Sequence, residues 1–123
     1  DPNCILLQTR AEDKYALADE MNRFYQHQLS INTWGGPLNI LECTPKGVNK
    51  AFALEYLLNV MNRDKKDLIA FGDEQNDREM LAFAGKGYAM KNANPALLPY
   101  ADEQISLTND QDGVAKTLRA LFL

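Results

Sequence analysis

Two carboxylates and an amide follow directly after a short apolar segment in the second half of the sequence. The apolar segment ends at Gly72, and Asp73, Asn76 and Asp77 come next. A short apolar run that stops at a glycine and leads into a helical pattern is typical of a buried strand ending in a tight turn. In open α/β sheets, ligands bind beyond the carboxyl ends of the strands. Oxygen ligands at such a place suit Mg2+ better than zinc or copper, so the sequence predicts a magnesium site here.

The same residues also fit a purely structural role. Asn76 and Glu79 have the spacing of a helix capping box, and Asp73 alone would serve to start the turn. Two acids and an amide at the ligand-binding end of a strand favour the site over the cap.

Lys50 and Asn92 are the other candidate binding residues. Lys50 lies in the first turn of a helix predicted over residues 49–61. The helix dipole disfavours a cation there, but the ammonium would point at a bound anion together with the helix N-terminal amides. Asn92 follows a short predicted strand and is expected to contact the acidic turn. The alternatives are a solvated lysine and an ordinary asparagine-containing turn.

Composition excludes several classes of protein. The 123 residues carry a net charge of −4 without a basic stripe, so nucleic acid is not an expected partner. No apolar run approaches the roughly 20 residues of a membrane helix. Cys4 and Cys43 lie in strand-like runs and are expected to be buried free thiols in a reducing cytoplasm. His27, the one histidine, is expected at a solvated helix end.

The elements that must position these residues fall into two groups. The first third predicts a β-α-β-β unit: a strand over 4–8, a helix over 11–28, and a hairpin of strands 29–34 and 38–43. A composition break at 44–47 is the candidate junction between two lobes.

Beyond the junction, strands and helices alternate. The predicted order is helix 49–61, strand 68–72, helix 76–84, strand 87–90, helical turn 95–100, strand 103–107 and helix 111–121. Such alternation predicts a parallel sheet with right-handed crossovers.

Residues 45–121 resemble the C-terminal half of the haloacid dehalogenase-like (HAD) phosphatases of the Cof-type subgroup. The matching pieces are Gly47-Val48-Asn49-Lys50, Ile69 to Asp77, Glu79-Met80-Leu81, Ala84-Gly85, Tyr88 to Ala93, Ala101-Asp102 and Asp112 to Ala115. The resemblance implies an α/β fold, with half of a HAD-like, Rossmann-type parallel sheet over residues 46–123. Residues 1–45 would be the C-terminal part of an α/β cap domain.

The resemblance also implies a function, the Mg2+-dependent hydrolysis of a phosphate monoester such as a sugar phosphate or another small phosphometabolite. Asp73 and Asp77 would serve the metal, with Asp77 orienting Asp73 or the metal-bound water. Lys50, Asn76 and Asn92 would contact the substrate, and Lys50 would also neutralise the charge of phosphate and nucleophile. Phosphoryl transfer depends mainly on such positioning and charge compensation.

The sequence departs from the family pattern in three places. Ala51 and Glu74 stand where the family usually has glycine, and Glu74 adds a negative charge beside the metal site. The nucleophile motif, an Asp-x-Asp followed by Gly-Thr, does not occur in the 123 residues. We therefore expect a fragment that is inactive alone. It should expose apolar surface and associate with itself or with a missing N-terminal segment.

Two other classes share parts of this pattern. The phosphorylation domain of a cation-pumping ATPase has a related acidic segment, but the cap-like first third and the lack of a membrane span argue against it. A non-catalytic or receiver-like Mg2+/phosphate-binding signalling module is the second alternative. Receiver acids lie near the start of the chain, where this sequence has no acid pair after a strand.

Overall fold

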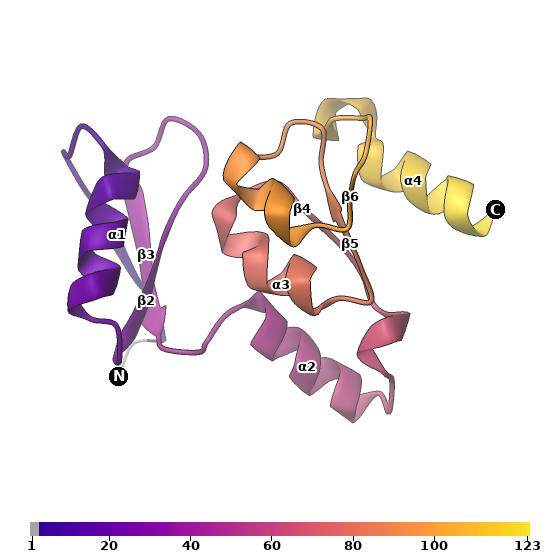
Figure 1. Ribbon diagram of the computed structural model, residues 1–123, viewed down its shortest axis with the longest axis horizontal. Helices are drawn as coiled ribbons and strands as arrows, with labels where there is room; N and C mark the ends of the chain where they lie inside the picture. Colours follow the sequence, from indigo (N-terminus) through magenta and orange to yellow (C-terminus); the bar gives the residue numbers. More distant parts are fainter. Residues whose placement is uncertain (1–2) are drawn as a thin grey trace.

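A computed structural model describes residues 3–123 and shows two separate three-stranded sheets (Figure 1). The first sheet contains β1 (Ile5–Gln8), β2 (Leu29–Thr33) and β3 (Ile40–Pro45) in the order β1-β3-β2, and all its pairs are antiparallel. Ile31 lies opposite Cys43 and Thr33 opposite Leu41, which confirms the predicted hairpin.

Helix α1 (Lys14–Phe24) covers one face of this sheet. Its Ala18 packs with Ile31, Leu41 and Cys43 in the core of the first lobe. The helix begins later than the predicted residue 11 because the Asp13 side chain accepts hydrogen bonds from the first-turn amides and fixes the start there. It also ends at Phe24, before the predicted residue 28, because a turn over 25–28 leads into β2.

Cys4 corrects one expectation. Cys43 is buried as predicted, but Cys4 is exposed. It precedes β1, a strand at the edge of the sheet whose four residues are all exposed. His27 is exposed in the turn after α1.

The second sheet is parallel, as predicted. It contains β4 (Ile69–Gly72), β5 (Lys86–Ala89) and β6 (Glu103–Gln104) in the order β4-β5-β6. Strand β6 has two residues instead of the predicted five. Its partner β5 ends at Ala89, and beyond that residue the two segments are joined by separate backbone bonds, from Ile105 N–H to the Ala89 carbonyl and from Lys91 N–H to the Leu107 carbonyl.

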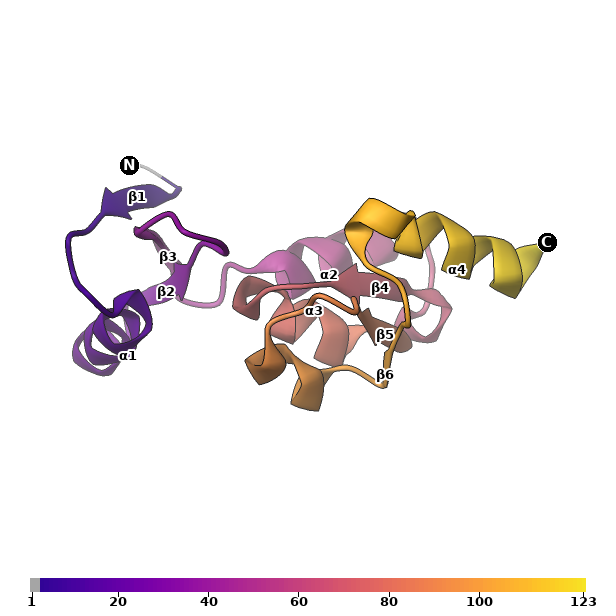
Figure 2. The same ribbon diagram turned by 90° about the horizontal axis from the view of Figure 1, so that it is seen from above.

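Helices α2 (Lys50–Val60) and α3 (Arg78–Phe83) pack together, and α4 (Gly113–Phe122) extends away from the first sheet (Figure 2). Short 3₁₀ helices cover 65–67, 75–77, 95–100 and 109–111. The second lobe has two small cores, one of Ala70, Leu81 and Leu97 and one of Tyr88, Met90 and Ile105. The predicted helix 76–84 begins at Arg78 because the 3₁₀ helix over 75–77 precedes it.

Apolar surface is exposed on both long helices of the second lobe. None of the residues of α2 is buried, and Tyr56 and Val60 are 69% and 67% exposed. On α4, Phe122 is 65% exposed. The apolar side chains of α2 are therefore only partly covered. None of the helices in residues 3–123 has both the length and the apolar character needed to cross a bilayer.

Residues 46–49 join the two sheets. Val48 N–H bonds to the Pro45 carbonyl over 3.0 Å and closes a turn. Gly47 has a φ of +86° there, a conformation that favours glycine. This turn delivers Lys50, the first residue of α2, to the region between the sheets.

Candidate active site

Asp77 organises the turn that follows β4. Its carboxylate is almost fully buried, and Oδ2 accepts hydrogen bonds from the N–H groups of Asp73 (3.0 Å) and Glu74 (3.3 Å). The Glu74 carboxylate in turn accepts from the Gln75 N–H over 2.8 Å. The capping box therefore joins Glu74 and Asp77, not Asn76 and Glu79 as the spacing suggested, because the 3₁₀ helix begins before Asn76.

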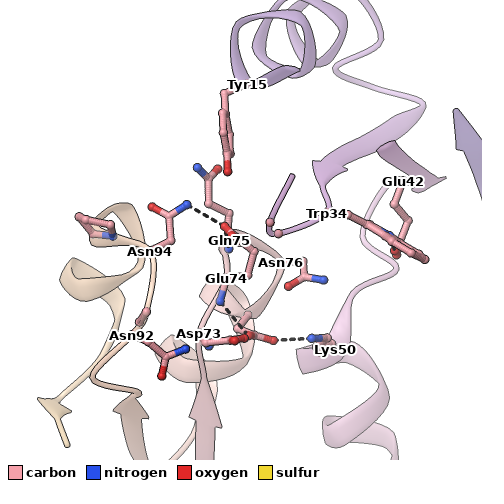
Figure 3. A pocket seen from close by; sticks show the side chains of 15 residues that line it. Tyr15, Trp34, Glu42, Lys50, Asp73, Glu74, Gln75, Asn76, Asn92 and Asn94 are labelled. Carbon is pink, nitrogen blue, oxygen red and sulfur yellow. Dashed lines mark hydrogen bonds and ion pairs between the residues drawn. The ribbon is translucent and has the colours of Figure 1, made fainter. Parts of the chain in front are cut away.

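Lys50 forms an ion pair with the other oxygen of Asp77, and a dashed line marks the contact in Figure 3. Asn49 caps α2 by accepting from the Phe52 N–H over 3.0 Å, so Lys50 is the first helical residue. Its side chain is 49% exposed, whereas that of Asp77 is 6% exposed. The carboxylate explains a lysine at this unfavourable end of a helix, and the half-exposed ammonium is still open to an anion.

The five residues predicted from the sequence line one cleft of about 970 Å³ between the two lobes. They are Lys50, Asp73, Asn76, Asp77 and Asn92. The first lobe contributes a second group that the sequence did not single out: Tyr15, Trp34, Gly35, Gly36 and Glu42. Figure 3 shows residues of both groups around the same space.

Asn94 forms hydrogen bonds with the acidic turn. Its Nδ2 donates to Glu74 Oε1 and its backbone N–H to the Asp73 carbonyl, each over 2.8 Å. Asn92 lines the same cleft, and its side-chain oxygen accepts a hydrogen bond from the Asn109 N–H over 3.3 Å and not from the acidic turn. An asparagine directly before a proline favours a turn, and this signal could have pointed to Asn94.

Glu74 also approaches the first lobe. A Cβ added at Gly35 would lie 3.0 Å from Glu74 Oε2. The Glu74 carboxylate, the departure from the family pattern, therefore accepts hydrogen bonds from Gln75 and Asn94 and lies close to the hairpin turn at Gly35.

Lys14 also binds that hairpin turn. Its side chain is buried, and Nζ donates to the carbonyls of Trp34 (2.6 Å), Gly36 (2.8 Å) and Leu38 (2.9 Å). A buried ammonium needs such partners, and three carbonyls satisfy its three donors. The indole of Trp34 donates to Glu42 Oε2 over 3.0 Å. No motif marks this group, because its members meet only after the hairpin has formed.

Tyr15 reaches from α1 toward Gln75 and the cleft (Figure 3). Burial raises the pKa of its phenol, and the carboxylates of Glu74 and Asp13 raise it further. The phenol therefore keeps its proton throughout the neutral range and can donate a hydrogen bond.

The cleft offers carboxylate and amide oxygens, the kind of donor that Mg2+ prefers. Within residues 3–123, no three side chains of His, Cys, Asp or Glu are grouped so as to hold a metal ion. Asp73 is exposed, lines the cleft and fits as one hard oxygen ligand. Both oxygens of Asp77 already have protein partners. Its contacts support the orienting role more directly than that of a metal ligand.

The sequence profile of the haloacid dehalogenase-like hydrolases matches residues 1–118. The chain belongs to this family. This HAD chain is 34% identical over 122 residues to the 5-amino-6-(5-phospho-D-ribitylamino)uracil phosphatase of Bacillus subtilis. The alignment covers 99% of this chain and 45% of that protein. It is 51% identical over 61 residues to the HMP-PP phosphatase of Cronobacter sakazakii, covering 50% of the chain and 22% of that protein.

A solved structure confirms the HAD-like α/β fold. The haloacid dehalogenase-like hydrolase from Bacteroides thetaiotaomicron superimposes with a TM-score of 0.71 at 34% identity, over 98% of this HAD chain and 44% of that chain. The present chain thus spans less than half the length of these relatives.

Proposed function

We propose that this chain supplies half of the active site of a Mg2+-dependent phosphatase that hydrolyses the monoester of a small phosphorylated metabolite. The observation that carries the proposal is the set of contacts around Asp77. This one carboxylate holds the Lys50 ammonium and the Asp73 turn at the carboxyl end of a parallel strand. Membership of the HAD hydrolases and the phosphatase names of two relatives support it.

Each residue has a role that follows from its placement. The half-exposed Lys50 would offset the charge of a phosphate in the cleft. Asp73 would hold Mg2+ through its exposed carboxylate, and Asp77 would keep that turn in place. Asn76 and Asn92 would contact the phosphorylated substrate from the same cleft. When bound, Mg2+ would supply Lewis-acid polarisation of a phosphoryl oxygen.

The two lobes would belong to different domains of the enzyme. We assign residues 1–45 to the C-terminal part of a cap domain and residues 46–123 to the C-terminal half of the core domain. The separate sheets and separate hydrophobic cores support this boundary. A cytoplasmic location is proposed as well, and the buried free thiol of Cys43 supports it.

The attacking carboxylate would come from a further polypeptide segment, since the 123 residues hold no Asp-x-Asp followed by Gly-Thr. We propose that this segment pairs with the edge strand β4 and covers the apolar side chains of α2 and α4. Without it, the chain would self-associate through the same surface. Val60→Glu should then shift the sedimentation of the chain toward monomer, whereas Glu55→Gln on the same helix should leave it unchanged. A chain that is monomeric at all concentrations would contradict the self-association.

The phosphate site can be tested on the 123-residue chain itself. Inorganic phosphate, titrated in the presence of Mg2+, should shift the backbone amide resonances of residues 73–77. Lys50→Gln should weaken the binding about tenfold, because a charge-assisted contact is lost. Lys66→Gln, an exposed lysine outside the cleft, is the matched control. Binding that is indifferent to Lys50 would refute the site.

Hydrolysis gives a second test. We expect no turnover of an aryl phosphate with Mg2+ by the chain alone, because the attacking group is missing. Turnover that Asp73→Ala abolishes would show that the chain carries its own nucleophile, and would refute the division of the active site proposed here.

A further inference from the structure

We propose that Trp34 and Glu42 form a binding site for a planar nitrogen heterocycle carried by the phosphorylated substrate. This inference rests on the proposed phosphatase function and specifies the substrate class. Both side chains line the same cleft as Lys50 and Asp73, and they come from the first lobe (Figure 3). The phosphate would thus bind against the second lobe and the ring against the first.

The indole and the carboxylate form one unit across two strands. Trp34 follows β2, and Glu42 lies on the neighbouring β3. The indole Nε1–H donates to Glu42 Oε2 over 3.0 Å, and both side chains are partly buried. The bond fixes the edge of the indole, and the indole lines the cleft. Glu42 Oε1 has no hydrogen-bond partner within the described residues and can accept another donor.

The unit is held in place before any ligand arrives. Lys14 of α1 donates hydrogen bonds to the carbonyls of Trp34, Gly36 and Leu38. The hairpin turn itself contains Gly36 at a φ of +72°, which favours glycine. An aromatic side chain fixed in this way loses little conformational entropy on binding, and this favours affinity.

The chemistry of the pair indicates what it would bind. An aromatic face attracts a planar ring through stacking, which raises affinity for a base about tenfold. A carboxylate accepts hydrogen bonds and offers none, so it selects ring N–H or amino groups. Glu42 and Glu74 make this side of the cleft acidic and disfavour a second anionic group on the ligand. A neutral or cationic amino-substituted heterocycle meets all three conditions, whereas a simple sugar phosphate offers no ring to stack.

Trp34 is the one tryptophan among the 123 residues, so its fluorescence reports on this site directly. Cytidine monophosphate and ribose 5-phosphate form a matched pair of probes, because both carry a phosphate on C5 of ribose and only the first carries an aminopyrimidine. With Mg2+ present, cytidine monophosphate should bind about tenfold more tightly and quench Trp34, whereas ribose 5-phosphate should leave the emission nearly unchanged.

Variants separate the contribution of stacking on Trp34 from that of the hydrogen bond to Glu42. Binding to each variant is measured from the shifts of the amide resonances. Trp34→Leu should remove the preference for cytidine monophosphate. Glu42→Gln should weaken the binding of cytidine monophosphate several-fold and leave the affinity for ribose 5-phosphate unchanged. Tyr56→Leu, an exposed aromatic of α2 outside the cleft, is the control and should change neither.

The outcomes distinguish this inference from the function on which it rests. Equal affinities for the two probes, both sensitive to Lys50→Gln, would overturn the heterocycle site and leave the phosphate site standing. Failure of inorganic phosphate and of both probes to bind would overturn both. A preference for cytidine monophosphate that survives Trp34→Leu would also overturn the inference.

Discussion

The side chain of Asp77 lies directly against Gly72, so closely that a Cβ added at position 72 would be 2.7 Å from the Asp77 Cβ and 3.0 Å from its carboxylate carbon. The strand therefore ends in glycine for a steric reason. Only without a side chain at this position can Asp77 fold back and accept the N–H groups of Asp73 and Glu74.

Gly72→Ala should therefore damage both stability and the site. We expect a loss of about 1–3 kcal/mol in the free energy of unfolding, the usual cost of overpacking, measured by urea denaturation. Phosphate affinity of the folded variant should also fall, because Asp77 must move. Gly85→Ala is the control, since its Cβ would meet the Lys66 backbone at 2.4 Å, away from the cleft. It should destabilise the chain but keep its phosphate affinity. The same affinity in folded Gly72→Ala would contradict the steric argument.

Removal of the Asp77 carboxylate tests the centre of the turn. Asp77→Ala leaves two N–H groups and one ammonium without their acceptor. Because Lys50 is half exposed, solvent offsets part of the loss, and we expect a destabilisation of about 2–3 kcal/mol. Glu79→Ala, an exposed acid on α3, should stay within about 0.5 kcal/mol of the parent in the same denaturation experiment. Similar values for the two variants would show that the buried contacts do not stabilise the turn.

Lys14 offers a test of the hairpin without touching the second lobe. Lys14→Met keeps an unbranched apolar stem but leaves three carbonyls without a donor. We expect a destabilisation of about 2–3 kcal/mol and faster amide hydrogen exchange over residues 34–38. Lys116→Met removes one exposed bond to the Gln111 carbonyl and should change neither quantity appreciably. Unchanged exchange in Lys14→Met would mean that the turn holds its shape without the ammonium.

The raised pKa of Tyr15 makes the stability of the fold depend on pH, and Glu74 of the other lobe contributes to the shift. Its pKa is raised above 10.0 by burial and by the Glu74 and Asp13 carboxylates. The folded chain thus keeps the phenolic proton to a higher pH than the unfolded chain. The resulting stability is present below pH 10.0 and is lost as the pH rises through the pKa of the folded state. Glu74→Gln should lower the pKa of Tyr15, measured from tyrosinate absorbance after subtraction of the Tyr15→Phe titration.

Glu12→Gln is the control for that titration, because Glu12 is exposed and is not among the groups that raise the pKa of Tyr15. An unchanged Tyr15 titration in Glu74→Gln would argue against electrostatic contact between the lobes.

The parallel sheet and the acidic turn could be predicted because their signals are local. The run from Leu68 to Gly72 followed by Asp73 and Asp77 contains both the strand and its chemistry within ten residues. The junction residues and Lys50 also lie in one short segment. Local spacing gave the wrong capping box, however, because a 3₁₀ helix shifted the start of the turn.

The missed residues meet through tertiary structure. Lys14 reaches the carbonyls of Trp34 and Leu38 only after α1 has packed on the hairpin. Asn92 and Asn94 are two residues apart, and the fold of the loop decides which of them faces Glu74. The exposure of Cys4 depends on the place of β1 at the sheet edge, which an apolar run cannot reveal.

The cleft combines four carboxylates, those of Glu42, Asp73, Glu74 and Asp77, with the single ammonium of Lys50. Because Asp77 already engages that ammonium, a phosphate dianion would meet an excess of negative charge. A divalent cation beside Asp73 would remove much of this repulsion, and the phosphate would in turn attract the cation. Metal and phosphate would therefore bind with positive cooperativity. By thermodynamic reciprocity, each would raise the affinity of the other by the same factor, so the cleft would respond to the two together rather than to either one.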